Sequence, residues 1–390
     1  MHHMAGGLPH RVLRDLANKY GPLMHLQLGE VSAVVVTSSE LAKQVLKIHD
    51  LAFASRPKLS AMDIICYDSH DIVFSPYGEY LRQMRKICVM ELLSAKNIWS
   101  FSSIRHDEVN RLIESIRSYS SSGELINFTE RVIWFTSCMI CRSAFGKVLK
   151  EQDEFIKLIG EVVSLAGGFD VADIFPSYKF LHSLSLAKKT LLRCPPLMKD
   201  RSLQFPITND SIKAIIDVSI EYCACSYLIN HILLPYPYPY IHIKINYKEL
   251  DMFAAGTETS SATTVWAMVE MMKNPSTLAK AQAEVRQAFR DKVTFDKIDV
   301  EELKYLKLVV KETMRFHAPV PLLWEEDVSR DVIWFSTLAN VYSLLAQLLY
   351  HFDWKLPTGM EPRDLDVSES SGATATRTSD LYLIATPYQP

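Results

Sequence analysis

The chain has no cysteine after position 225, although it is 390 residues long. Its seven cysteines are an odd, irregularly spaced set, which argues against a disulfide framework and favours reduced, mostly buried thiols. Cys138 and Cys141 have a zinc-like or redox-like spacing, but they fall in an apolar helical stretch. We therefore expect core thiols there. A zinc site at this pair, or at Cys223 and Cys225, is a poor fit because no complete ligand set is visible.

The sequence also has no excess of charge of either sign. Its 42 basic and 45 acidic residues leave a net charge of −3, which gives no reason to expect a nucleic-acid partner. Thirteen glycines and eighteen prolines are too few for a collagen-like or low-complexity chain. An apolar content of 48% is too high for disorder. The composition therefore indicates a globular protein and identifies no chemistry.

Long hydrophobic runs are missing as well. The first twenty residues contain no apolar run, which excludes a signal peptide or an amino-terminal membrane span as written. The most hydrophobic region, residues 212–245, is interrupted by Asp217, Glu221, His231 and a Pro-Tyr repeat from Pro235. We expect no membrane span there.

Hydrophobic periodicity predicts a mostly helical chain. Residues 10–20 have helical spacing and stop at Gly21, and alternation over 24–28 and 32–37 predicts a hairpin. Ser38 or Ser39 can cap a following helix. Alternation over 380–386 predicts an edge strand. Further helices are expected over most of 78–192 and over 250–290, 300–317 and 337–351.

Residues 250–272 predict a long, nearly all-apolar central helix that is rich in hydroxyl groups. Ala254, Ala255 and Gly256 leave room for a flat body to approach the backbone. Glu258 and Thr259 place a carboxylate and a hydroxyl beside that gap. The threonine hydroxyl can bond a carbonyl one turn back or stay free for a bound water. A simple helix–helix crossing at the small residues is the alternative, and the spacing does not decide between them.

A second helix over 302–317 carries Glu312 and Arg315 three residues apart. A surface ion pair is the default interpretation. Burial is the alternative, because Leu306, Val309, Val310 and Met314 surround the pair. The prolines that follow His317 predict an extended exit from the helix.

Together these stretches resemble cytochrome P450 monooxygenases. Ala255–Thr259 is similar to the oxygen-binding motif of the family's central helix, and Glu312 with Arg315 is similar to its ExxR pair. Pro76–Lys86 is similar to the helix whose WxxxR residues hold the haem propionates. The segments 53–57 and 19–22 also fit. The sequence of these segments most resembles that of plant microsomal enzymes that hydroxylate terpenoids, especially sesquiterpene hydrocarbons.

The resemblance covers 1–215, 251–323 and 338–390, and it implies a mainly α, incomplete cytochrome P450 fold. The expected architecture is a long central helix with a small peripheral β-sheet, in one incomplete domain over 1–390. Residues 217–250 are rich in Ile and Tyr, fit no part of the pattern, and are interpreted as a non-family insertion from translated intron. Residues 324–337 are interpreted as a junction that replaces the haem-ligand loop.

The resemblance also implies the site. The cofactors are haem and NADPH, the latter acting through a partner reductase. Thr259 with Glu258 would deliver protons to bound oxygen. Arg85 would pair with a haem propionate, Ala255 and Gly256 would face the haem, and Glu312 with Arg315 would brace the scaffold beside it. Contacts with a small apolar substrate are expected from Ile64, Ala254, Val320, Leu322, Leu323, Ala373 and Thr374.

Two departures from the family pattern concern the haem. The family's ligand loop carries a cysteine after ExxR, whereas here counting back from Leu338 puts Asp331 at that position. A carboxylate is a poor substitute for thiolate donation. Leu81 stands where WxxxR has its tryptophan. We therefore expect no metal ligand and no monooxygenase activity from the chain as written.

Three functional hypotheses follow. The chain is a working haem monooxygenase, a catalytically dead fragment or mis-assembled gene product of one, or a non-enzymatic helical protein that binds apolar ligands or partner oxygenases. The family resides at the endoplasmic-reticulum membrane. Because no anchor is visible here, the sequence predicts a cytoplasmic or membrane-peripheral chain, with membrane association still open.

Overall fold

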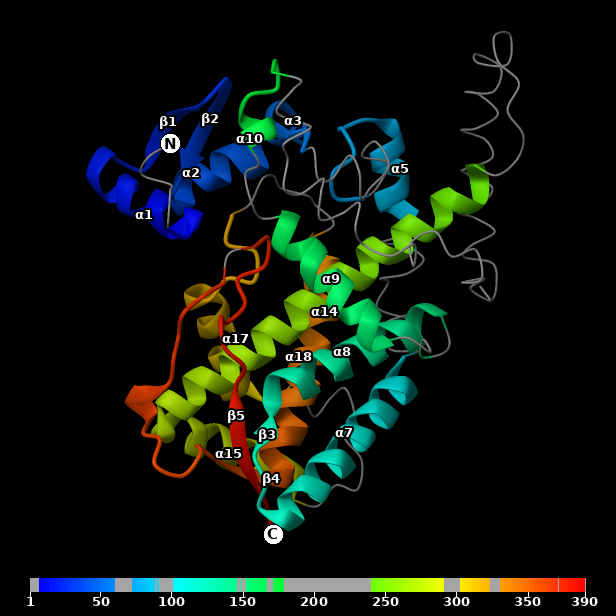
Figure 1. The fold of residues 1–390 in the computed structure, drawn as a ribbon, viewed down its shortest axis with the longest axis vertical. Helices are drawn as coiled ribbons and strands as arrows, with labels where there is room; N and C mark the ends of the chain where they lie inside the picture. Colours follow the sequence, from blue (N-terminus) through cyan, green and yellow to red (C-terminus); the bar gives the residue numbers. More distant parts are fainter. Residues whose placement is uncertain are drawn as a thin grey trace.

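The computed structural model describes residues 7–59, 72–87, 90, 101–145, 148, 152–166, 171–178, 240–290, 302–322, 330–370 and 372–389. Within these ranges the chain is mainly helical with two small antiparallel sheets, as the sequence predicts. Figure 1 shows the amino-terminal elements as a group at the top and the larger helical body below them.

The amino-terminal group confirms the predicted elements closely. Helix α1 (Pro9–Tyr20) ends at Gly21, whose φ of 106° is a backbone conformation that glycine adopts at little cost. Strands β1 (Leu23–Leu28) and β2 (Val31–Val36) form the hairpin, in a register that pairs Leu23 with Val36. Ser38 caps α2 (Ser39–Lys43) by accepting the Leu41 amide at 3.2 Å. The π-helix η1 (Gln44–Ile48) and α3 (Asp50–Phe53) complete the group.

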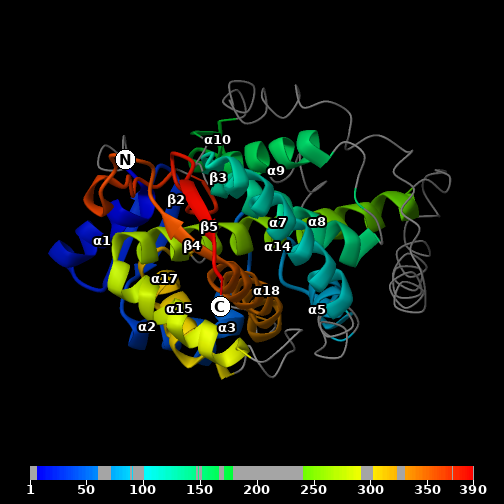
Figure 2. The ribbon, with the colours of Figure 1, turned by 90° about the horizontal axis from the view of Figure 1, so that it is seen from below.

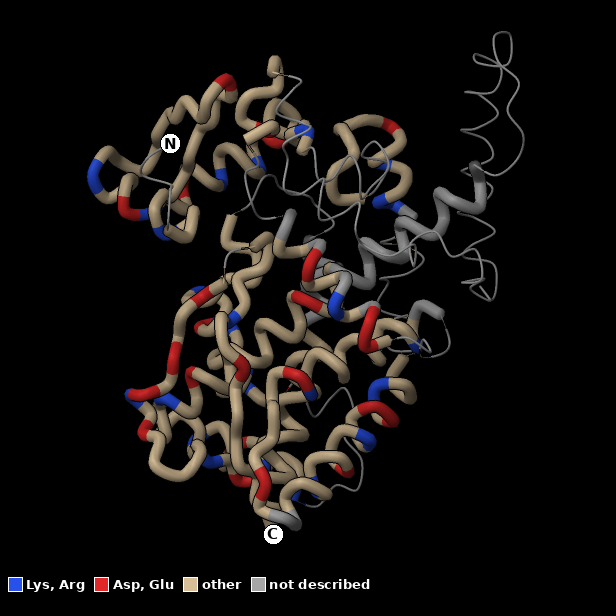
Figure 3. The backbone as a smooth tube through the Cα atoms, viewed as in Figure 1, with Lys and Arg blue, Asp and Glu red and all other residues tan. Residues whose placement is uncertain are grey.

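The rest of the chain supplies the helical body and, in the upper part of Figure 1, the short helices α5 and α10. The helices are α5 (Glu79–Ile87), α7 (Ser102–Ser122), α8 (Phe128–Phe145), α9 (Gln152–Ala166), α10 (Val171–Ile174), α14 (Tyr240–Lys273), α15 (Pro275–Phe289), α17 (Lys304–Phe316) and α18 (Arg330–His351), with the short 3-10 helix η4 (Pro362–Asp364). Acidic and basic positions alternate along α7 in Figure 3.

Helix α14 runs through the middle of this body. Figure 2 shows it between α8 and α9 on one side and α15, α17 and α18 on the other, and it contacts all five. Every residue from Ser260 to Val269 is buried, which explains why the segment is apolar on nearly every face. Its Trp266 and Met268 belong to one core with residues of α7, α8, α15, α17, α18 and the carboxyl-terminal sheet.

The carboxyl-terminal sheet corrects one prediction. Strand β5 (Tyr382–Pro387) is the central strand of three, between β3 (Ile126–Asn127) and β4 (Phe352–Lys355), and is no edge strand. Alternation reports which side chains are buried, here Leu383 and Ala385, but it carries no information on how many neighbours the strand has. The partners come from segments far away in the sequence.

The two segments that fit no pattern are described only in part. Residues 240–250, which the sequence analysis assigned to an insertion outside the family pattern, continue α14 amino-terminally. Residues 217–239 lie outside the described residues. Of the predicted junction 324–337, residues 330–337 form the first turns of α18, and Asp331 therefore has a helical backbone. In the described part of the chain, no helix combines the length and hydropathy needed to cross a membrane.

Candidate functional site

The hydroxyl groups of α14 bond to the helix itself. Thr259 donates to the Ala255 carbonyl at 2.6 Å, and Thr263 and Thr264 each donate to the carbonyl four residues earlier at 2.8 Å. Ser261 donates to the Glu258 carbonyl at 3.1 Å. Of the two states that the sequence left open for Thr259, the structure contains the back-bonded one. Its hydroxyl proton is therefore engaged within the helix.

The small-residue gap at Gly256 is filled by another helix. A Cβ atom built on Gly256 would lie 2.8 Å from Cδ1 and 3.3 Å from Cγ1 of Ile140 in α8. Helices α8 and α14 are thus in close contact where α14 has no side chain. This contact favours the helix-crossing interpretation at Gly256 over a gap kept open for a flat ligand.

Glu258 lies on a different face of α14 and lines a cavity of about 270 Å³. The cavity lies among α8, α9, α14 and the turn that precedes β5. The predicted residues Glu258 and Thr374 meet here, from positions more than a hundred residues apart. Its apolar lining includes Ile133, Val163, Ala262, Val265 and Trp266, and its polar lining includes Thr129, Ser164, Ser261, Ser370, Thr376, Arg377 and Asp380.

The electrostatics of the cavity centre on Glu258. Burial raises the pKa of this carboxyl above its ordinary value, because a charged carboxylate loses hydration there. Burial also lowers the pKa of Arg377. Arg377 donates to the Asp366 carbonyl at 2.8 Å, while its Nε and Nη1 atoms are buried and have no hydrogen-bond partner among the described residues. The cavity thus combines apolar side chains with a larger number of polar ones, and two of its charged groups, Glu258 and Arg377, are desolvated.

The turn that carries Ala373 and Thr374 is fixed by its backbone. The Ala373 amide donates to the Val163 carbonyl of α9 at 3.1 Å, and the Ala375 amide donates to the Pro319 carbonyl at 2.9 Å. Val320 follows Pro319 directly, so two predicted substrate segments meet at this turn. Leu322 is partly buried. Ile64 and Leu323 lie outside the described residues, and only the backbone of Ala254, in α14, is described.

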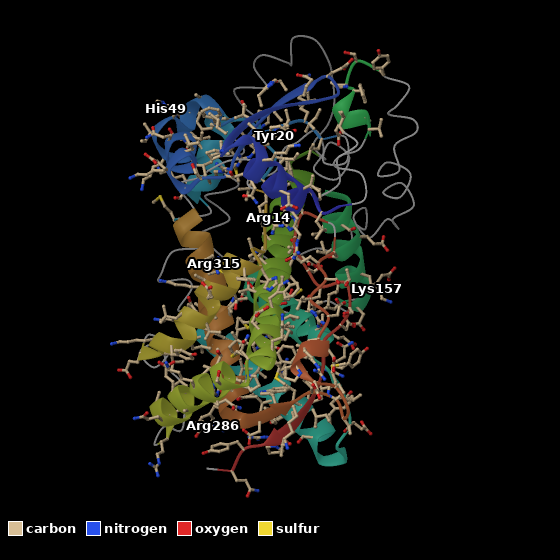
Figure 4. The ribbon with its side chains drawn as sticks, turned by 90° about the vertical axis from the view of Figure 1, so that its left-hand side faces the viewer. Arg14, Tyr20, His49, Lys157, Arg286 and Arg315 are labelled. Atoms are coloured by element: carbon tan, nitrogen blue, oxygen red, sulfur yellow. The ribbon has the colours of Figure 1, made fainter. Side chains whose placement is uncertain are left out.

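Glu312 and Arg315 form an ion pair on the surface of α17. Arg315 donates to both carboxylate oxygens, with Nε–Oε2 and Nη2–Oε1 distances of 2.8 and 2.6 Å. Both side chains are more than 60% exposed, so the surface interpretation is correct and the alternative of burial is wrong. The pair lowers the pKa of Glu312 and raises that of Arg315. Figure 4 labels Arg315 at this helix.

Arg85 lies in α5, outside the cavity lining. Its Nη2 atom lies 3.4 Å from the Ile72 carbonyl to which it donates, and the neighbouring Leu81, which replaces the expected tryptophan, is fully buried. Figure 1 shows α5 near the amino-terminal elements, away from the lower part of α14. The structure therefore brings Glu258 and Thr374 together but places Arg85 and the Glu312–Arg315 pair elsewhere.

Sequence reasoning missed a buried polar cluster next to the cavity. His317 contacts Glu270 and Glu369 and stacks on Trp266, and Glu369 also contacts His10 and Arg11. The only local signal was the position of His317 at the end of a helix. Its partners are 47 and 52 residues away, and His10 is 359 residues from Glu369. Such pairings cannot be read from one sequence.

Comparison with known proteins identifies the family. The family described as Cytochrome P450 matches residues 1–192 and 241–333. Cytochrome P450 71D7 of Solanum chacoense is 56% identical over 490 residues, which cover 100% of this chain and 91% of that protein. Premnaspirodiene oxygenase of Hyoscyamus muticus is 51% identical over 490 residues with the same coverage.

The chain belongs to the cytochrome P450 family. A zebra fish cytochrome P450 structure with abiraterone has a TM-score of 0.72 to this chain at 17% identity, and the match covers 98% of this chain and 100% of that one. This match shows the cytochrome P450 fold. The similarity to plant terpenoid oxygenases agrees with the resemblance in the sequence. Cytochromes P450 bind haem and typically receive electrons from NADPH through a partner reductase, and plant relatives of this type are typically microsomal membrane proteins.

The described residues do not provide the thiolate that a cytochrome P450 uses to bind haem iron. Cys138 and Cys141 are fully buried in α8. Burial raises the pKa of Cys138 to about 12, although Gln152 donates to its sulfur at 3.2 Å, and the thiol form is therefore favoured. No group of three or more His, Cys, Asp or Glu side chains in the described ranges could hold a metal ion. The other five cysteines lie outside those ranges and before ExxR.

Proposed function

We propose that this chain is a plant terpenoid cytochrome P450 that has lost haem–thiolate monooxygenase chemistry and retains a small apolar-ligand cavity. The observation that carries this proposal is the absence of cysteine between ExxR and the end of the sequence. The family places its iron ligand in that interval, and the counted position holds Asp331. A carboxylate does not supply the electron donation that O–O cleavage needs.

The organisation of the chain supports the same proposal. The alignment with the Solanum relative runs over 490 residues while this chain has 390, so 100 aligned positions of the relative have no counterpart here. The family match also stops at residue 192 and resumes at 241. We infer that internal segments have been lost and that residues 217–240, which the family match leaves out, belong to an insertion. We infer a junction at 324–337, which the match reaches only as far as residue 333. One cDNA that spans residues 200–340 tests this inference, and unbroken transcript reads across both segments would contradict it.

The cavity supports the retained binding function. It is slightly smaller than the lower end of ordinary ligand pockets, about 300 Å³, so a compact hydrocarbon suits it better than an extended one. Similar proteins include premnaspirodiene oxygenase and germacrene A hydroxylase, which point to terpenoid hydrocarbons as the ligand class. Association of this chain with the reductase and with a membrane surface stays a prediction, which is based on its membership of the family.

A paired assay tests binding and turnover separately. The full chain, supplied with haem, a plant reductase and NADPH, is incubated with premnaspirodiene beside the Hyoscyamus oxygenase as the positive control. We expect a ligand-dependent rise in melting temperature without oxygenated product. Product formation by this chain would show that the working-enzyme hypothesis is right. Absence of any melting shift, with the control active, would remove the retained binding function.

A matched variant connects the melting shift to the cavity. Ala262→Phe fills space in the lining of the cavity and should abolish the shift. Ala279→Phe adds the same bulk at an exposed position of α15 and should leave the shift unchanged. Equal effects of the two substitutions would contradict binding in this cavity.

A further inference from the structure

The buried cluster around His317 joins four distant parts of the chain. His317 follows α17, Glu270 is in the last turn of α14, Glu369 precedes the turn before β5, and His10 and Arg11 are in the first turn of α1. The His317 ring stacks on Trp266 with a centroid distance of 3.8 Å and an interplanar angle of 3°. The cluster is therefore a tertiary junction at the edge of the helical body.

The geometry requires a doubly protonated ring. Nδ1 of His317 lies 3.1 Å from Oε1 of Glu369, and Nε2 lies 3.0 Å from Oε1 of Glu270. Ionised carboxylates only accept hydrogen bonds, so both ring nitrogens must donate. A neutral imidazole would direct one lone pair at a carboxylate oxygen, and one of the two contacts would become repulsive.

The cluster also holds a wall of the ligand cavity. Oε2 of Glu369 accepts from Nε2 of His10 at 2.9 Å and from Nε of Arg11 at 3.1 Å. The next residue, Ser370, lines the cavity. Trp266 lines it too, and its indole donates to the Ala375 carbonyl at 2.9 Å. A change at His317 would therefore reach both α1 and the cavity turn.

We propose that His317 is a proton-operated latch: while its ring is protonated, it clamps Glu270 and Glu369 and so fixes α1 and the 369–376 turn against the end of α14. His317 here is a positioning residue, because it acts on the cavity through Trp266 and Glu369. The latch does not depend on haem binding or on turnover.

The charged groups that face the latch set its pH window. Burial alone would lower the pKa of His317, but the bonds to Glu270 and Glu369 outweigh it and raise the pKa above 6.5. Burial alone would raise the pKa of Glu369, but His317, Arg11 and His10 hold it at about 2. The pKa of Glu270 is lowered by His317, with a smaller contribution from Lys273.

The sign of the effect follows from these directions. A histidine with a raised folded-state pKa stabilises the fold fully below its unfolded value of 6.5, and this contribution is lost as the pH rises through the folded value. Glu369 contributes above its unfolded value of 4.5 and is lost as the pH falls toward about 2. The latch is therefore fully closed between those unfolded values and opens toward alkaline pH.

Hydrogen exchange by mass spectrometry on the full chain tests the latch, from about pH 5 to about pH 9 and corrected for intrinsic exchange rates. In the wild type, the protection of α1 and of residues 366–378 should fall together as the pH rises. The fall should be about tenfold for each unit by which the folded-state pKa of His317 exceeds its unfolded value. Protection of α8 should stay constant. The proposal would be overturned if the protection of α1 and the protection of the 366–378 segment changed independently with pH.

Two variants separate the latch from general destabilisation. His317→Gln cannot be protonated, so α1 and the 366–378 segment should exchange rapidly at all pH values, with the pH dependence gone. The control His25→Gln changes an exposed histidine that contacts Ser32 in the hairpin and should behave as wild type. Should His317→Gln not fold, Glu369→Gln takes its place with the same expectation. Retention of the wild-type pH profile in the variant that folds would contradict the latch.

Discussion

Glu258 is the residue at which the chemistry of the cavity is concentrated. Its carboxyl has been taken out of water by α8, α9 and the turn before β5, and burial raises its pKa. For an acid with a raised folded-state pKa, the folded state binds more protons than the unfolded state between the two pKa values. Stability therefore falls as the pH rises through that interval.

Replacement of Glu258 by Gln should remove this loss of stability. We expect Glu258→Gln to melt at a higher temperature than the wild type near neutral pH, and at the same temperature at pH values below 4.5, where the carboxyl is protonated in both states. Differential scanning calorimetry across pH measures both conditions. Glu302→Gln, at an exposed position, is the matched control and should shift neither value. A lower melting temperature for Glu258→Gln near neutral pH would show that an ion pair holds the carboxylate.

Residue-level predictions succeeded where one segment carried the information. The helix over 250–272 was predicted from its own sequence, and a cap at Ser38 or Ser39 was predicted from the residues before Glu40; the structure has the cap at Ser38. The sequence could not decide between an open gap and a helix crossing at Gly256, because Ile140 comes from another helix. The His317 cluster was missed for the same reason.

Helix α17 is the element with the sharpest contrast between its two faces. Leu306 and Val310 are fully buried against the core, while Leu308 and Phe316 are more than 60% exposed beside the Glu312–Arg315 pair. Exposed ion pairs of this kind contribute little to stability. The contribution of α17 to the fold therefore comes from its inward face.

Two phenylalanine truncations compare the shared core, which α17 faces, with the exposed face of α17. Phe289, at the end of α15, is fully buried and packs edge-on against Tyr350 with ring centroids 6.0 Å apart. Phe289→Ala should lower the free energy of unfolding by about 3–5 kcal/mol. Phe316→Ala should change it by no more than about 0.5 kcal/mol. Chemical denaturation measures both. A large loss for Phe316→Ala would mean that another surface covers this face of α17 in solution.

Among the elements, the sequence predicted existence and type better than connection. Helices α1, α8, α17 and α18 and the β1–β2 hairpin follow from local periodicity. The position of β5 in the middle of its sheet depends on residues 126–127 and 352–355, which one strand's pattern does not report. Helix α14 begins at residue 240, within the Ile- and Tyr-rich segment 217–250 that was assigned to an insertion.

At the scale of the molecule, a family core persists although 100 aligned positions of the relative are missing. Helix α14 keeps its packing on α8, α15, α17 and α18, and this packing maintains the fold. This architecture was predicted from the resemblance to the family. The motifs on two helices indicate the family, whereas the composition does not. The proposed loss of the iron ligand concerns the amino-terminal end of α18, where Asp331 lies.

The carbon-monoxide difference spectrum of the reduced, haem-supplied full chain tests the central claim most directly. We expect no thiolate-type Soret band, because no described thiol is both ionisable and accessible and no cysteine follows ExxR. The Hyoscyamus oxygenase, prepared in the same way, should show the band. A thiolate-type band of stoichiometric intensity from this chain would prove that an upstream cysteine binds the iron and would contradict the account.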